Sequence, residues 1–79
     1  MNTLVKNSPA KAVNVWFADK KLFVRIEDGR EIAVPLEWFP KLRDAKREDL
    51  NKWRFIGNGI GIHWESLDED LSVEELFNS

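Results

Sequence analysis

Residues 57–64 read GNGIGIHW, and this stretch decides the fold class. Asn58-Gly59 is the strongest short signal for a β-hairpin, because both residues tolerate the positive φ angles that a two-residue turn needs. A two-residue loop at this point pairs Trp53 with Trp64 and keeps the apolar side chains of both strands on one face. We therefore predict a β-hairpin with strands at residues 53–57 and 60–64.

The next segment, residues 67–76, reads LDEDLSVEEL and predicts an acidic turn followed by a terminal helix. Ser72 and Glu75 have the spacing of a capping box, in which two side chains bond the free backbone N–H groups at a helix start. The acids before Ser72 then lie in a turn, where they complement the positive end of the helix dipole. We expect the helix near residues 72–78. Three apolar side chains should bury it against the sheet: Val73, Leu76 and Phe77.

Residues 12–26 alternate between two sets of side chains, which is typical of strands with one buried face. A two-residue loop at Asp19-Lys20 brings the apolar set together, although neither residue is the Gly or Asn that such turns favour. Because the register is self-consistent, we predict strands at residues 12–18 and 21–26. The expected pairs are Phe17 with Leu22, Val15 with Val24, and Val13 with Ile26.

A third strand, at residues 30–34, completes an antiparallel meander. A two-residue loop at Asp28-Gly29 would mix the two faces, because it places Arg25 opposite Ile32. A three-residue loop that ends at Gly29 instead sets Arg25 against Glu31 and leaves the apolar residues in register. This loop is a type I turn with a glycine bulge, and it predicts a positive φ for Gly29.

Two prolines mark the end of the third strand and the start of a helix. Pro35 lacks the N–H that a strand ladder needs, and Pro40 fits the first turn of a helix. We expect a short helix near residues 38–45 and a second helical turn around residues 47–50. The fold class is therefore α+β, with an antiparallel β-meander, a β-hairpin and short helices.

The composition fits one small domain. The chain has 79 residues with four Trp and five Phe to build its core, and no Cys for a disulfide or a thiolate metal site. We expect a loose lead-in over residues 1–11 and a single α+β domain over residues 12–79. The sequence contains neither an apolar run that could span a membrane nor the core of a signal peptide, so we expect a cytoplasmic protein without a membrane partner.

Charge is unevenly distributed along the chain. Residues 1–54 carry a formal charge of +4, whereas residues 55–79 hold six acids and no Lys or Arg. The acidic end argues against phosphate binding there. A basic stretch, residues 41–52, is interleaved with acids and is typical of a solvated helix face, with weak nucleic-acid binding as an alternative. Its basic residues are Lys41, Arg43, Lys46, Arg47 and Lys52.

Five segments in order carry a family resemblance: EDGR at 27–30, VPLEWFP at 34–40, Trp53, GIGIHW at 59–64 and LDEDLSVE at 67–74. Together they make roughly residues 12–78 similar to the bacterial domain of unknown function family 2442. The resemblance implies a compact α+β domain with no established enzymatic role. It also implies a toxin–antitoxin-like gene pair, because family members are often encoded beside another small protein.

His63 is the side chain best suited to acid–base or metal chemistry, since imidazole titrates near neutral pH and binds metals. Glu65 shares its face if the strand continues, and Asp68 or Asp70 would be a further ligand. The alternative interpretation is a surface His against Arg54 or a backbone carbonyl. Ser66 does not make a nucleophilic triad with them, because neighbours at one strand end rarely converge. We expect no catalytic residue, metal or cofactor; the alternative is a small enzyme or metal site at His63, Glu65 and Asp68.

The outer face of the meander is the strongest candidate for binding a partner. The register places Trp16 directly opposite Phe23, with the pair Arg25 and Glu31 beside them. If a helix covers this face, the aromatic side chains form a second core. If the face is open, an aromatic patch beside opposite charges is typical of a partner surface. We therefore expect a non-enzymatic protein-interaction module whose partner is a small cognate protein or a second copy of the chain.

Overall fold

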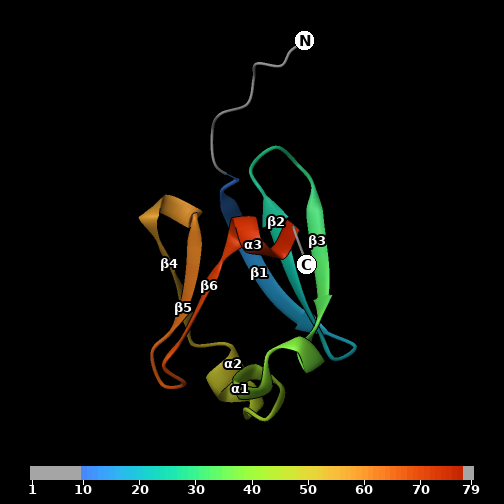
Figure 1. Cartoon of the computed structure of the whole chain (residues 1–79), viewed down its shortest axis with the longest axis vertical. Coiled ribbons are helices and arrows are strands. Elements are labelled where there is room, and N and C mark those ends of the chain that lie inside the picture. Colours follow the sequence, from blue (N-terminus) through green and yellow to red (C-terminus); the bar gives the residue numbers. More distant parts are fainter. Residues whose placement is uncertain (1–9, 78–79) are drawn as a thin grey trace.

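The computed structural model describes residues 10–77 and has the α+β class expected from the sequence (Figure 1). It contains two three-stranded antiparallel sheets. The first is formed by β1 (Ala12–Ala18), β2 (Lys21–Ile26) and β3 (Glu31–Pro35). The second is formed by β4 (Trp53–Ile56), β5 (Gly61–Trp64) and β6 (Glu69–Ser72). The short helical segments are η2 (Leu36–Trp38), α1 (Pro40–Arg43), α2 (Arg47–Leu50), η3 (Gly57–Gly59) and α3 (Val73–Phe77).

The meander has the predicted register over most of its length. Phe17 lies opposite Leu22, and Val15 lies opposite Val24. The glycine-bulge turn between β2 and β3 is also confirmed, because Gly29 has a φ of 102°. The buried residues Val15, Leu22, Val24 and Val34 therefore share the inner face of the sheet, as their spacing predicts.

The predicted pairing of Val13 with Ile26 is wrong. Ala12 lies opposite Ile26 instead, and Val13 is the extra residue of a β-bulge. Val13 is 52% exposed, whereas Ala12 takes the buried position. Beside the bulge, the side-chain oxygen of Asn14 accepts a hydrogen bond of 2.9 Å from the backbone N–H of Val15. The bulge thus shifts one apolar residue of β1 from the core to solvent.

The turn between β1 and β2 is formed by two residues that seldom adopt its geometry. Asp19 and Lys20 have φ angles of 52° and 62°, as both central residues of a type I′ turn require. A side chain with a Cβ is strained in this left-handed region. The burial of the flanking apolar residues therefore outweighs the local preference of the turn.

The hairpin of β4 and β5 is as predicted, with Trp53 opposite Trp64. β4 ends one residue sooner than expected and β5 begins one residue later, so residues 57–60 form the connection in place of the predicted two-residue loop at Asn58-Gly59. Positive φ angles occur at Gly57, Asn58 and Gly59.

The acidic segment after the hairpin contains a strand that the sequence did not predict. β6 pairs with β5, so that Asp70 lies opposite His63 and Leu71 lies opposite Ile62. The turn is confined to residues 65–68. Glu69 and Asp70 have low strand propensity, but pairing with β5 and burial of Leu71 decide the local structure. The prediction that these acids lie in a turn is therefore wrong for Glu69 and Asp70.

The helix predicted near residues 38–45 consists of two pieces, η2 and α1, and α1 begins at Pro40 as expected. The second helical turn is α2. In Figure 1 these helices lie below both sheets, where Leu42 and Leu50 are buried. No helix among residues 10–77 is long and apolar enough to cross a membrane.

The terminal helix α3 buries Val73 and Leu76, as predicted, but Phe77 is 37% exposed. The guanidinium of Arg30 lies 4.7 Å from the centroid of the Phe77 ring, so this side chain packs at the surface. Residue 78 of the predicted helix and residues 1–9 of the predicted lead-in lie outside the described residues. Ala10 packs against the core.

The inner faces of the two sheets contribute to one hydrophobic core. Phe17 of β1 meets Trp64 of β5 with ring centroids 6.4 Å apart and an edge-on angle of 61°. The indole N–H of Trp64 donates a buried hydrogen bond of 2.9 Å to the carbonyl of Leu50 in α2. Trp64 therefore joins both sheets and the helical layer. The outer faces of both sheets are left to display the polar and aromatic residues that alternate with the core.

Candidate functional site

The outer face of the β1–β3 sheet carries an aromatic pair. Trp16 and Phe23 are cross-strand partners, with ring centroids 5.5 Å apart and ring planes inclined by 6°. Their neighbours along each strand, Val15 and Leu22, point into the core. Strand alternation therefore fixes both rings on the outside of the sheet. Stacked aromatic pairs of this kind contribute about 1 kcal/mol beyond the area they bury.

Two charged residues extend this aromatic pair. The guanidinium of Arg25 lies 5.6 Å from the centroid of the Trp16 ring, a cation–π distance, and it also forms an ion pair with Glu31. The four residues predicted from the sequence as a partner surface thus form one contiguous group. We call Trp16, Phe23, Arg25 and Glu31 the aromatic face.

The aromatic face is open to solvent within the part of the chain that the structure describes. Trp16 and Phe23 are half-buried, and Arg25 and Glu31 are exposed. Ala33, the cross-strand partner of Phe23 on β3, is also exposed. Among residues 10–77 these side chains do not form a second core, which was the alternative left open by the sequence.

A second polar group lies on the outer face of the β4–β6 sheet, around His63. Its Nδ1 contacts the Asp70 carboxylate, and its Nε2 lies 3.3 Å from Glu65 Oε1. The same Glu65 oxygen lies 3.5 Å from the guanidinium of Arg54. Arg54, His63 and Asp70 occupy one cross-strand row, so the four side chains form a chain of polar contacts across the sheet.

The structure separates the other residues of the predicted polar site. Asp68 lies in the turn, where its backbone carbonyl accepts a hydrogen bond of 3.0 Å from Lys41 Nζ. The Ser66 hydroxyl is paired with Asp49, at 3.4 Å, rather than with His63. Within residues 10–77, no group of three or more His, Cys, Asp or Glu side chains is arranged to hold a metal ion.

The basic stretch is partly neutralised by its own acids. Arg43 pairs with Asp44 at 2.9 Å, and this hydrogen bond raises the pKa of Arg43 and lowers the pKa of the Asp44 carboxyl. Lys41 lies 4.0 Å from Glu69. These pairings reduce the positive charge that the stretch can offer to phosphate groups.

A family model described as "Protein of unknown function (DUF2442)" matches residues 12–79. The chain belongs to this family. The DUF2442 domain is also similar to a solved structure, a protein of unknown function from Rhodospirillum rubrum ATCC 11170. The two share 29% sequence identity with a TM-score of 0.78, over 90% of this chain and 88% of that chain. Among curated proteins, none matches this chain.

From the sequence, Asp70 of this DUF2442 domain was named only as an alternative to Asp68 beside His63, and the strand that brings it there was not predicted. The row of Arg54 and His63 follows from the hairpin register alone. Asp70 joins the row only because β6 is a strand. The alternation of Asp70 and Ser72 with the buried Leu71 was the available signal, but the capping motif and acidic composition pointed to a turn.

Proposed function

We propose that this DUF2442 domain is a non-enzymatic interaction module that binds a small partner protein through the aromatic face. The observation that carries the proposal is the half-exposed Trp16–Phe23 stack, with Arg25 over the Trp16 ring. Trp and Arg are the residue types that most often dominate the energy of protein interfaces. An aromatic patch flanked by an ion pair supplies both the apolar centre and the polar rim of such an interface.

The two aromatic rings of this face are held rigidly. Trp16 and Phe23 stand on adjacent strands and hold each other parallel, so each ring has little freedom to lose on binding. A preorganised surface spends less of its interaction energy on ordering side chains. The aromatic face is therefore better suited to docking a protein than an equal area of mobile loop would be.

The His63 group supports the non-enzymatic part of the proposal. Its histidine is held between two carboxylates, and the nearby Ser66 hydroxyl is paired with Asp49. Nucleophilic catalysis needs the hydroxyl within hydrogen-bond reach of its base. The group is better explained as a chain of surface polar contacts that joins three strands.

The proposed partner is the small protein encoded beside this gene, as the toxin–antitoxin-like arrangement implied by the family resemblance suggests, and the proposed place of action is the cytoplasm. A homodimer formed through the same face is the competing outcome. The rim carries one charge of each sign, Arg25 and Glu31, which are already paired with each other. Their pairing leaves the aromatic rings as the main anchors.

The test is co-expression with the product of the adjacent gene, followed by affinity capture of the tagged domain. The Trp16→Ala variant should weaken capture by about tenfold or more, as hot-spot residues do. Trp38→Ala is the matched control, because Trp38 is 50% exposed but lies on η2. Equal behaviour of the two variants, or no capture by the parent protein, would overturn the proposal. A dimer of the isolated domain that Trp16→Ala dissociates would assign the face to a second copy.

A further inference from the structure

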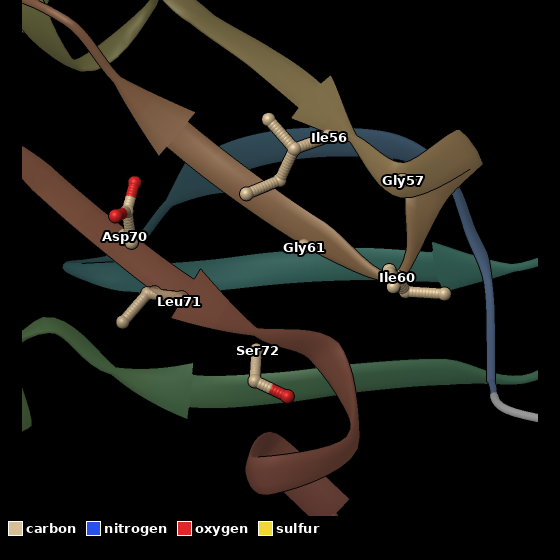
Figure 2. A pocket seen from close by; sticks show the side chains of 7 residues that line it. All are labelled: Ile56, Gly57, Ile60, Gly61, Asp70, Leu71 and Ser72. Carbon is tan, nitrogen blue, oxygen red and sulfur yellow. The ribbon is translucent and has the colours of Figure 1, made fainter.

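A pocket of about 320 Å³ lies on the outer face of the β4–β6 sheet, away from the aromatic face (Figure 2). It is lined by Ile56, Gly57, Ile60, Gly61, Asp70, Leu71 and Ser72. Ile56, Gly61 and Ser72 form one cross-strand row, so the pocket extends over all three strands.

Gly61 on the central strand gives room to a side chain that lines the pocket. A Cβ on Gly61 would lie only 2.8 Å from Cγ1 of Ile56, so the Ile56 side chain packs directly over the Gly61 backbone. Ile60 packs against Gly57 in the same manner, since a Cβ there would lie 2.5 Å from its Cγ1. The two isoleucines remain 36% and 42% exposed. They offer apolar surface that residues 10–77 do not cover.

The pocket has a polar side formed by β6. Figure 2 shows the Asp70 carboxylate and the Ser72 hydroxyl on this side, with Ile56 on the side of β4. The Asp70 side chain is 67% exposed, although one of its oxygens contacts His63. Arg54, the cation on the same face, is paired with Glu65. A carboxylate therefore stands at the edge of an apolar hollow.

The surrounding segment favours a positively charged ligand. Residues 55–79 contain six acidic residues and no Lys or Arg. Complementary charge steers partners toward such a surface and suppresses binding of anions. Lys and Arg side chains combine an apolar stem with a charged head, and both parts match this pocket.

We propose that the pocket binds a Lys or Arg side chain from a basic peptide segment of a partner protein. The alkyl stem lies against Ile56 and Ile60, and the charged head bonds the Asp70 carboxylate. This site is on the opposite sheet from the aromatic face and does not depend on the function proposed for that face. It gives the domain a second point of contact, with specificity for basic side chains.

The experiment is a titration of the ¹⁵N-labelled domain with short capped peptides, followed by amide chemical shifts. The probes are Gly-Arg-Gly and Gly-Lys-Gly, with Gly-norleucine-Gly as the uncharged analogue and Gly-Glu-Gly as the anion. The Arg and Lys peptides should shift the amides of Gly57, Ile60 and Gly61 saturably. The norleucine peptide should bind about fivefold more weakly, because it lacks the charge-assisted bond. Shifts of equal size with the Glu peptide would overturn the proposal.

Variants locate the binding. Asp70→Asn should weaken binding of the Arg peptide by about threefold or more. Asp28→Asn, the same change in the β2–β3 turn, should leave this binding unchanged. Ile60→Ala should weaken binding of the Arg and norleucine peptides alike, because it removes apolar surface from the wall of the pocket. Trp16→Ala should retain peptide binding, which separates this site from the aromatic face. Unaltered binding by both Asp70→Asn and Ile60→Ala would reject the pocket as the site.

Discussion

Gly29 and Gly59 have the same φ of 102° but different surroundings. A Cβ on Gly29 would meet nothing within 4 Å, whereas a Cβ on Gly59 would lie 2.5 Å from the backbone oxygen of Ala12. Gly59 thus lets the β4–β5 loop touch the start of β1. A substitution at Gly29 therefore tests the backbone angle alone, whereas a substitution at Gly59 tests the angle together with the contact to Ala12.

We predict that Gly29→Ala lowers the free energy of unfolding by about 1 kcal/mol, the usual cost of a Cβ in this region. Gly59→Ala should cost about 2 kcal/mol more, because the loop must also move away from β1. Urea unfolding followed by tryptophan fluorescence measures both. Equal losses would show that the contact with Ala12 has no energetic weight.

Asp28 provides a pH-dependent prediction at the residue scale. The backbone N–H of Arg30 is the main cause that lowers the pKa of the Asp28 carboxyl below its ordinary value of 3.8, and the Arg30 side chain adds to it. A carboxyl with a lowered folded-state pKa stabilises the fold above its unfolded-state pKa and loses this effect as pH falls through the folded-state value. The parent protein should therefore exceed Asp28→Asn in stability at about pH 7, and the gap should close toward about pH 3. Urea unfolding at both pH values measures the difference in the free energy of unfolding between the two proteins. A difference that stays constant with pH would contradict the role of the Asp28 carboxylate.

At the scale of elements, the pairing of β1 with β2 leaves only two residues for the turn between them and so strains their backbone. Asp19 and Lys20 both have positive φ in a turn for which Asn-Gly is preferred. The double substitution Asp19→Asn with Lys20→Gly should raise the free energy of unfolding by about 1 kcal/mol, since it relieves the left-handed strain. Thermal unfolding measures the gain. The control is Asp44→Asn with Ala45→Gly, which places the same two residues outside such a turn and should give no gain in stability. A gain there would argue against the turn as the cause.

Register was the most predictable part of these elements, and it also located the aromatic face. Pairing Phe17 with Leu22 was enough to place Trp16 beside Phe23. The bulge at Val13 was not predictable from alternation, because Ala12 and Val13 are both apolar, and the backbone of Ala12 lies against the loop at Gly59, far away in the sequence. β6 was missed because a non-local partner, β5, decides its conformation. The position of Asp70 opposite His63, and the pocket beside it, could therefore not be predicted from the sequence.

At the scale of the whole molecule, Trp64 connects both sheets with the helical layer. Trp64 contacts Phe17 of the first sheet and bonds the carbonyl of Leu50 in α2. Trp64→Phe should lower the free energy of unfolding by about 2 kcal/mol, because it leaves that buried carbonyl without a donor and opens a small void. Urea unfolding followed by circular dichroism measures this. Trp38→Phe, at the surface, should change little, and a comparable loss there would contradict the role given to the buried bond.

The bulge in β1 has a consequence for how the molecule behaves at high concentration. A bare sheet edge can recruit a strand from a neighbouring chain and so begin aggregation. Here the N–H of Val15 is already bonded by the Asn14 side chain, beside a bulge that bends the strand. On the far side of the same sheet, Pro35 offers no N–H at all. Both edges of the first sheet are thereby protected against the addition of a strand from a neighbouring chain.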